Sequence, residues 1–187
     1  MRCFFGLRLP KSAQHLLMER YQPLRQRLSG VGGTWVPQEN LHLTLRFLGE
    51  TDARRRNLVT RGLETVFPYM EAPQLRLGDP GLFPPRGSRR LILWAGLEGE
   101  LPRLEALAQE LEARARRAGF APEQRRFKPH VTLARLPARA MPLLQGASLP
   151  ALPAEDCTPN EVHLFQSVRD ARGLHYPSWQ SWPFSPT

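Results

Sequence analysis

Two short motifs in this chain repeat a histidine and a threonine two residues apart. "HLTL" occupies residues 42–45 and "HVTL" occupies residues 130–133, and apolar residues alternate with the polar ones in both. Such alternation is typical of a half-buried β-strand, in which residues i and i+2 point to the same face. Each histidine therefore shares a face with its threonine. The repetition suggests a duplicated unit whose halves face one another across a cleft.

Two imidazoles on opposite sides of one reacting atom can divide acid–base catalysis between them. A neutral histidine takes a proton while a protonated one gives a proton. Displacement at phosphorus needs this arrangement, because water enters on one side as an alkoxide leaves on the other. His42 and His130 are the candidates for these roles, and the hydroxyls of Thr44 and Thr132 could stabilise charge on the phosphate oxygens. A single His-x-Thr pair is usually structural, but two copies on alternating strands indicate a shared site.

Other common catalytic chemistries have little support in the sequence. Neither motif has an aspartate or glutamate at metal-ligand spacing, and no H-E-x-x-H pattern occurs. No serine or cysteine lies in a convincing nucleophile motif. We therefore expect a reaction that uses no metal and no other cofactor.

Strand and helix patterns are interleaved along the chain, and both motifs fall in strands. Pro23 should kink or divide the first predicted helix, and Thr51 or Asp52 can cap the second. The predicted strands lie at 3–9, 34–47, 73–97 with a turn at 79–88, 127–136 and 160–168; the predicted helices lie at 11–29, about 51–66 and 101–118; residues 137–157 are predicted to form a loop.

These patterns predict an α+β fold with antiparallel or mixed sheets, because several neighbouring strands are joined by loops too short for parallel crossovers. No linker of domain-separating composition interrupts residues 1–187, so we expect a single domain. The duplicated motif predicts that this domain consists of two intertwined, pseudo-symmetric lobes around a central cleft, with helices on the outer sides. Each lobe would contribute one motif, at 42–45 and at 130–133.

The charge of the chain favours an anionic partner. The formal net charge is +9, and nucleic acid is the first partner to consider for such a protein. Only Lys11 and Lys128 are lysines, however, and the chain is rich in arginine, alanine and proline. Genome composition or heat adaptation can produce the same usage, so charge alone leaves both explanations open.

We expect a cytoplasmic protein with no membrane segment. No apolar run approaches the roughly 18 residues that a membrane span needs. The opening "MRCFFGLRLP" is interrupted by Arg8 and no small-residue cleavage site follows, which indicates a first strand instead of a signal peptide. Cys3 and Cys157 are far apart and fit two inert thiols in a reducing compartment.

Three longer stretches carry a family resemblance. "WVPQENLHLTLRFLGE", "LILWAGL" and "RFKPHVTLARL" resemble the bacterial and archaeal 2′-5′ RNA ligase-like proteins, also called RNA 2′,3′-cyclic phosphodiesterases, of the two-histidine phosphoesterase superfamily. The resemblance runs from "CFFGLRLP" to "NEVHLFQSV", which is nearly the whole chain. It implies two similar α+β lobes with antiparallel sheets around a central cleft, in agreement with the patterns above.

The resemblance also implies an activity and the roles of several residues. Members of this family open a 2′,3′-cyclic phosphate to leave a 2′-phosphate. By this resemblance the first histidine, here His42, would be the acid for the departing 3′ oxygen, and the second, here His130, would be the base for water. Thr44 and Thr132 would contact the phosphate, as would a basic residue after the second motif, here Arg135.

The basic residues near the motifs differ in the face to which they should point. A regular strand would turn Arg135 away from His130, so a bulge or strand end near Ala134 is required to re-aim it. Arg46 and Lys128 share the parity of the histidines and are further candidates for contact with RNA or phosphate.

Two other activities remain open at this point. The same site could join a 2′,3′-cyclic phosphate to a 5′-hydroxyl as a 2′-5′ linkage, or the protein could bind and protect RNA ends without turnover. The expected partners are RNA ends, including tRNA fragments, or small cyclic nucleotides. We expect the protein to be a monomer.

Several other residues have structural interpretations that the sequence favours. His163 alternates with apolar neighbours and could face the cleft, although a structural role is favoured. Trp35 and Trp94 are predicted to be core residues in preference to platforms for base stacking, and Phe47 is a predicted core residue by parity. The run "ARRR" at 53–56 is typical of a solvated helix face, but it could also extend a basic path for RNA.

Overall fold

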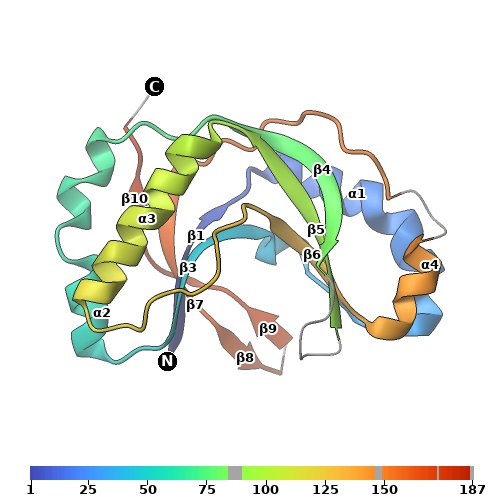
Figure 1. The fold of residues 1–187 in the computed structure, drawn as a ribbon, viewed down its shortest axis with the longest axis horizontal. Helices are drawn as coiled ribbons and strands as arrows, with labels where there is room; N and C mark the ends of the chain where they lie inside the picture. Colours follow the sequence, from blue (N-terminus) through green and yellow to red (C-terminus); the bar gives the residue numbers. More distant parts are fainter. Residues whose placement is uncertain (84–89, 146–148, 172, 186–187) are drawn as a thin grey trace.

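The computed structural model describes residues 1–83, 90–145, 149–171 and 173–185. Within them, eight strands form one sheet in the order β10-β7-β1-β3-β6-β5-β4, with β2 paired to β6, and β8 and β9 form a separate hairpin (Figure 1). Every registered strand pair is antiparallel, so the predicted α+β fold is confirmed. The strands are β1 Arg2–Arg8, β2 Thr34–Trp35, β3 His42–Glu50, β4 Leu75–Phe83, β5 Arg90–Gly99, β6 Val131–Pro137, β7 Glu161–Gln166, β8 Val168–Asp170, β9 Gly173–His175 and β10 Ser178–Pro183.

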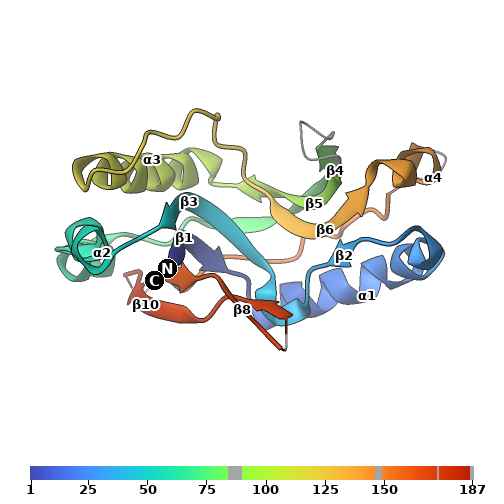
Figure 2. The same cartoon turned by 90° about the horizontal axis from the view of Figure 1, so that it is seen from below.

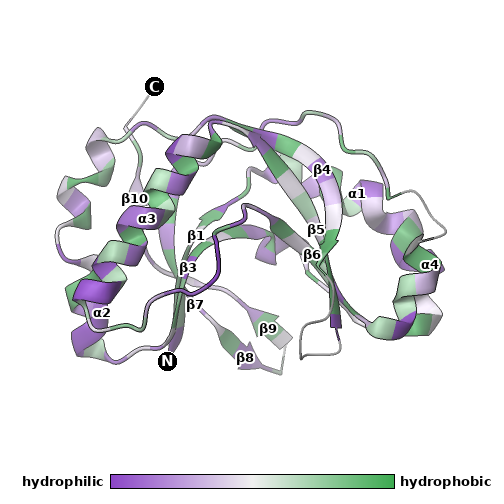
Figure 3. Cartoon of the chain, in the orientation of Figure 1, coloured by the Kyte–Doolittle hydropathy of each residue, from purple (hydrophilic) through white to green (hydrophobic). Residues whose placement is uncertain are grey.

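The helices lie at the two outer sides of the sheet. Figure 1 shows α2 and α3 at one side and α1 and α4 at the other. Their bounds are α1 Lys11–Arg27, α2 Ala53–Thr60, α3 Leu101–Arg117 and α4 Met141–Gln145. Along α3 hydrophobic residues alternate with hydrophilic ones (Figure 3), because residues three and four apart share the face that packs on the sheet. The buried members of that face are Leu104, Leu107, Ala108, Leu111 and Ala115.

A narrow seam divides the sheet into two halves. Strand β3 pairs with β1 from His42 to Glu50, and β6 pairs with β5 from Val131 to Pro137. Between β3 and β6, in contrast, the register consists of the single pair Leu43 and Val131. The halves β10-β7-β1-β3 and β6-β5-β4 therefore meet at one point, which Figure 2 shows near the middle of the molecule. Each half carries one of the two motifs.

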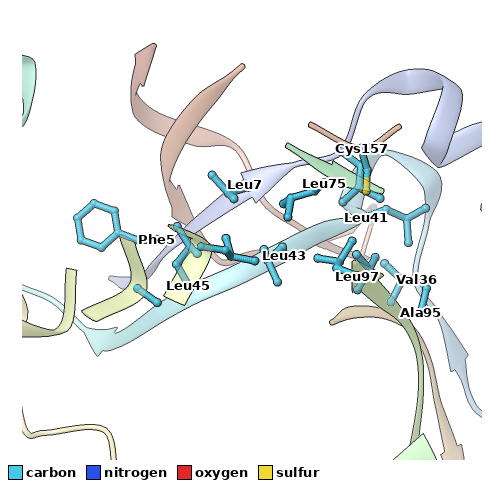
Figure 4. Close-up of a cluster of buried hydrophobic side chains, with 14 of the residues drawn as sticks. Phe5, Leu7, Val36, Leu41, Leu43, Leu45, Leu75, Ala95, Leu97 and Cys157 are labelled. Atoms are coloured by element: carbon cyan, nitrogen blue, oxygen red, sulfur yellow. The ribbon is translucent and has the colours of Figure 1, made fainter. Parts of the chain in front are cut away.

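The core lies on the face of the strands opposite to the motif histidines. Phe5, Leu7, Leu43 and Leu45 of β1 and β3 are almost fully buried, and Figure 4 shows them packed together. Burial of each such side chain stabilises the fold by roughly 1.5–3 kcal/mol. Because side chains alternate along a strand, the same packing fixes His42 and Thr44 on the other face.

The second helix is shorter than the sequence predicts. Asp52 caps it as predicted, since its carboxylate accepts a hydrogen bond of 2.8 Å from the backbone N–H of Arg55. The helix ends at Thr60, however, and not near residue 66. Gly62 adopts a left-handed conformation with φ of 78°, which ends an α-helix. Two 3₁₀ turns, Leu63–Thr65 and Phe67–Tyr69, follow it.

Three further expectations need correction. Pro23 lies inside the single helix α1, so of the two effects expected of it the division is wrong, and a kink stays a prediction. Strand β4 continues to Phe83, so residues 79–83 are not part of a turn, and the remainder of the predicted turn, 84–88, lies outside the described residues. The predicted loop at 137–157 contains the short helix α4 and a 3₁₀ turn, Ala138–Ala140.

The chain's opening residues and its cysteines behave as expected. Arg2–Arg8 form β1 near the middle of the sheet. Cys3 and Cys157 are both buried and free. No helix in the described part of the chain is long and apolar enough to cross a membrane.

Candidate active site

The four motif residues surround the seam between the two half-sheets. Because Leu43 pairs with Val131 in antiparallel register, His42 lies opposite Thr132 and Thr44 lies opposite His130. All four side chains are half-buried. The two histidines thus occupy diagonal positions, for which separations of about 7–8 Å are usual. A phosphate group can lie between imidazoles at such a separation.

Backbone carbonyls select the same tautomer for both histidines. Nδ1 of His42 lies 2.6 Å from the carbonyl oxygen of Asn40, and Nδ1 of His130 lies 2.7 Å from that of Lys128. A carbonyl only accepts hydrogen bonds, so each Nδ1 carries a proton and each Nε2 is left for proton transfer. Nε2 of His42 lies 3.2 Å from the Thr44 hydroxyl. The amide of Asn40 donates to the Leu174 carbonyl at 2.7 Å and so helps to hold this residue in place.

An aromatic wall surrounds His42. The ring centroids of Phe4 and Tyr176 each lie 4.9 Å from that of His42, and Phe165 lies at 5.8 Å. Burial is the largest cause that lowers the pKa of His42, and the positive charges of Arg135, Arg8 and His130 act in the same direction, whereas the Asn40 carbonyl opposes them; together they bring the pKa to about 4. Without a ligand, His42 is therefore neutral at pH 7.

His130 has an aromatic wall of its own, which also carries Lys128. Phe83 meets the His130 ring edge-on at 4.9 Å, and Trp94 lies at 6.4 Å. Nζ of Lys128 lies 4.5 Å from the Trp94 ring centroid and 5.1 Å from that of Phe83. Burial lowers the pKa of His130, and the charges of Lys128 and Arg135 add to this effect. Trp94, predicted as core, is a half-buried part of this wall.

A β-bulge brings Arg135 to the face of the histidines. Leu93 pairs with Ala134 and Trp94 with Thr132, so Leu133 is an extra residue on β6. Leu133 and Ala134 are consequently both buried, and Arg135 follows Thr132 on the exposed side. The bulge that we predicted near Ala134 is therefore present. Arg135 thus lies on the face of the histidines, and its charge lowers the pKa of both His42 and His130.

A matching bulge in β3 removes Arg46 from the site. Phe5 pairs with Arg46 and Gly6 with Thr44, so Leu45 is the extra residue. Arg46 is 7% exposed and pairs with Glu112 of α3, and it donates to the Ala121 carbonyl at 2.5 Å. The prediction that Arg46 shares the face of His42 is therefore wrong. The prediction that Phe47 is a core residue is wrong for the same reason, since its side chain is 54% exposed.

The model of one protein family matches most of the chain. It is described as the 2′-5′ RNA ligase superfamily, and it matches residues 10–171. The chain belongs to the 2′-5′ RNA ligase superfamily. With the bulges included, its two motifs read His-x-Thr-x-x-Phe and His-x-Thr-x-x-Arg, so that Phe47 and Arg135 hold equivalent positions in the two halves.

Curated relatives of this superfamily member are named RNA 2′,3′-cyclic phosphodiesterase, which is the name of an enzyme. One from Aeropyrum pernix is 36% identical over 117 residues, which cover 62% of this chain and 65% of the relative. One from Thermotoga maritima is 32% identical over 73% of this chain and 70% of its own length. The Escherichia coli relative is 31% identical over 72% and 71%, respectively.

Solved structures of relatives share the whole fold. The E. coli protein LigT complexed with 3′-AMP superposes with a TM-score of 0.79 at 27% identity, covering 99% of this chain and 98% of its own. A protein from Thermus thermophilus superposes with a TM-score of 0.70 at 28% identity, covering 98% of each chain.

Arg8 is a residue of this superfamily site that the sequence analysis missed. It pairs with His42 across β1 and β3, and its guanidinium lies 5.0 Å from the Phe165 ring. Its Nη1 donates to the Glu39 carbonyl at 2.8 Å. The alternation of "CFFGLRLP" places Arg8 on one face with Phe4, but only the pairing of β1 with β3 reveals that this is the face of His42.

His163 lies one layer away from the reacting groups. Its ring stacks on Phe165 at 4.8 Å, Nδ1 lies 3.0 Å from the Ser178 hydroxyl and Nε2 lies 3.4 Å from Glu161. It is 5% exposed. His163 therefore supports the aromatic wall of His42, in agreement with the structural role that the sequence favours.

The candidate site lies apart from a large hollow and from any cluster of metal-binding side chains among the described residues. A hollow of about 810 Å³ lies between the start of β4 and residues 154–160, and its lining includes neither the motif residues nor Arg8 or Arg135. Among the described residues, no group of three His, Cys, Asp or Glu side chains is placed to hold a metal ion. The seam thus brings together His42, His130, Thr44, Thr132 and Arg135.

Proposed function

We propose that this protein hydrolyses terminal 2′,3′-cyclic phosphates of RNA to 2′-phosphates by acid–base catalysis with two histidines and no metal. The observation that carries the proposal is the diagonal placement of His42 and His130 across the seam. Their Nδ1 atoms are both held by backbone carbonyls, so both Nε2 atoms are available to a ligand between them. The names of the curated relatives support the same substrate class.

The unequal surroundings of the histidines support a division of roles. The ring of His42 is enclosed by Phe4, Phe165 and Tyr176, which suits an acid that protonates the departing 3′ oxygen inside the site. The hydrogen bond between Nδ1 of His130 and the Lys128 carbonyl is exposed, whereas the one between Nδ1 of His42 and the Asn40 carbonyl is partly buried. His130 therefore lies on the more open side of the site, which suits the base that takes a proton from water.

The bound phosphate supplies the charge that the acid needs. His42 has a pKa of about 4 without a ligand, so at pH 7 its Nε2 carries no proton to donate. An anionic cyclic phosphate between the imidazoles raises the pKa of both. In the reaction water attacks phosphorus, its proton passes to Nε2 of His130, the bond from phosphorus to O3′ breaks, and O3′ takes the proton from His42.

Three neighbouring groups stabilise the phosphate during this step. Each threonine lies across the seam from the histidine of the other motif, so both hydroxyls face the bound group. Arg135 provides a positive charge on the same face. Hydrogen-bond donors fixed before the reaction stabilise developing charge without reorganisation of the solvent.

The decisive experiment uses a short RNA that ends in a 2′,3′-cyclic phosphate, incubated with the protein in EDTA. We expect conversion to a 2′-phosphate, and His42→Ala and His130→Ala should each lower turnover by about 100-fold or more. Addition of a second RNA with a 5′-hydroxyl tests for ligation. Binding without turnover, or turnover that EDTA abolishes, would contradict the proposal.

A further inference from the structure

The end of the sheet where β1 begins and β3 ends carries basic and aromatic side chains that the proposed reaction does not use. We propose that Arg2, Arg56 and Trp179 at this end bind the single-stranded RNA that leads to the reacting terminal nucleotide. This inference rests on the proposed function, because it concerns the body of the same substrate.

Strand β1 connects the candidate active site to this end of the sheet. The pairing of β1 with β7 runs without a register shift from Cys3 to Leu7, and the alternation of a regular strand places Arg2, Phe4 and Arg8 on one face. Arg8 pairs with His42 and Phe4 contacts the His42 ring. Arg2 lies six residues from Arg8, which corresponds to about 20 Å along the strand, and it is exposed. The face of the histidines therefore ends in a basic group far enough away to meet neighbouring nucleotides.

A row of aromatic rings crosses the sheet at the same end. Phe47, Phe4 and Phe165 are in register on three adjacent strands, and Ser178 of the edge strand β10 continues the row, which is about 14 Å wide. Phe4 and Phe165 are buried, whereas Phe47 is 54% exposed. Trp179 follows Ser178 as the unpaired residue of a register shift in β10, beside the row, and is 51% exposed.

Arg56 covers part of the outer aromatic residue. Its guanidinium lies 4.2 Å from the centroid of the Trp179 ring. Arg56 belongs to α2, which follows β3 directly, and Figure 2 shows α2, β10 and the start of β1 at one end of the molecule. An exposed indole beside a cation offers a base one stacking surface and its phosphate one positive charge.

The nearby carboxylates of Glu50 and Asp52 do not neutralise Arg2 or Arg56, because they pair with other groups. Glu50 pairs with the N-terminal amine at 3.1 Å, and Asp52 pairs with Arg55 at 2.8 Å. In the part of the chain that the structure describes, neither Arg2 nor Arg56 has an ion pair. Unpaired cations interleaved with exposed aromatic rings favour single-stranded RNA over an acidic protein, which would use the charge but not the rings.

The test compares a long ligand with a short one. We measure the affinity of a ten-nucleotide RNA ending in a 2′-phosphate, together with kcat/KM on a 2′,3′-cyclic mononucleotide. Trp179→Ala and Arg56→Gln should each weaken binding of the RNA about tenfold and leave mononucleotide hydrolysis within about twofold. Trp179→Phe should retain most of the affinity, because it keeps a stacking surface. Arg56→Gln should also reduce the dependence of log Kd on log salt concentration by about 0.7.

Arg20→Gln provides the matched control, because Arg20 is an exposed arginine of α1, at the opposite side of the molecule. Equal losses for Arg20→Gln and Arg56→Gln would overturn the inference, and so would unchanged RNA affinity in both variants at the proposed surface. The proposed function is tested separately, by hydrolysis of the mononucleotide by the unsubstituted protein. Its failure would leave the RNA-binding measurement as an independent result.

Discussion

At the scale of single residues, His42 and His130 begin with the same tautomer and differ in their surroundings. Both donate through Nδ1 to the carbonyl two residues earlier. His42 lies among Phe4, Phe165 and Tyr176, whereas His130 contacts Phe83 and is more open to water. The two histidines should therefore respond differently to a substrate whose leaving group needs less help from an acid.

A substrate with a better leaving group at the 3′ position separates these roles. Such a group needs little protonation, so His42→Ala should recover much of its lost rate on this substrate. His130→Ala should remain about 100-fold slow or worse, because water still needs a base. Single-turnover rates of both variants on both substrates provide the measurement. Recovery of His130→Ala alone would mean that the two roles are exchanged.

The buried state of His42 also makes stability depend on pH. Its pKa is about 4 in the folded protein and about 6.5 in the unfolded chain. Between these values the unfolded chain binds more protons, so the free energy of unfolding falls as the pH is lowered from 7 towards 4. The contribution amounts to at most about 3 kcal/mol. The free energy of unfolding in urea, measured at several pH values, should fall less steeply with decreasing pH for His42→Gln than for the wild type. Parallel pH profiles would contradict the low pKa of His42.

At the scale of elements, two bulges decide which side chains reach the site. The extra residues Leu45 and Leu133 shift the alternation by one position in β3 and β6. Arg46 is consequently buried against Glu112, and Arg135 joins the histidines. The two arginines that follow the two motifs therefore have different surroundings, and we expect Arg46 to contribute to stability and Arg135 to the reaction.

Replacing each of these two arginines with uncharged glutamine should affect activity in one case and stability in the other. Arg135→Gln should lower kcat/KM by about 10- to 100-fold with little change in the melting temperature. Arg46→Gln leaves Glu112 without its partner and should lower the free energy of unfolding by about 2–3 kcal/mol, with kcat/KM nearly unchanged at a temperature where it stays folded. Thermal melts and steady-state kinetics on both variants make the comparison. A loss of activity without a loss of stability in Arg46→Gln would refute it.

The elements were more predictable from the sequence than the contacts between them. Alternation identified the strands of both motifs and the residues that point away from the core, because side-chain direction along a strand is a local property. The sequence also indicated that a bulge near Ala134 was necessary for Arg135. It did not reveal the bulge at Leu45, so the faces predicted for Arg46 and Phe47 were both wrong. The repeat contained the signal, since alignment of "HLTLRF" with "HVTLAR" puts Phe47 beside Arg135.

The pairing of Arg8 with His42 could not be obtained in this way. More than thirty residues separate the two positions in the sequence, and their contact depends on which strands become neighbours. The same holds for the aromatic wall, since Tyr176 and Phe165 come from the last part of the chain. The sequence predicted the reacting groups, but only the fold supplies their surroundings.

At the scale of the whole molecule, the net charge of +9 should act on long RNA more than on a small cyclic nucleotide. Phosphate binding releases counterions, so affinity falls with salt in proportion to the number of contacts. With about three contacts to single-stranded RNA, affinity should fall more than tenfold between 50 and 200 mM salt. A cyclic mononucleotide should lose only a few-fold. Titrations of both ligands at several salt concentrations test this, and equal losses would show that no charge beyond the site takes part.

The diagonal of histidines and threonines has one more consequence, which concerns regiochemistry. Rotation by half a turn about the Leu43–Val131 pair exchanges His42 with His130 and Thr44 with Thr132, so these four groups alone could cleave at either the 2′ or the 3′ oxygen. The choice must come from the residues that break this symmetry, above all Phe47 and Arg135. Substitutions at these two positions should therefore mix 3′-phosphate with 2′-phosphate products, whereas a conservative Thr44→Ser or Thr132→Ser change should slow the reaction and leave the product ratio as it was.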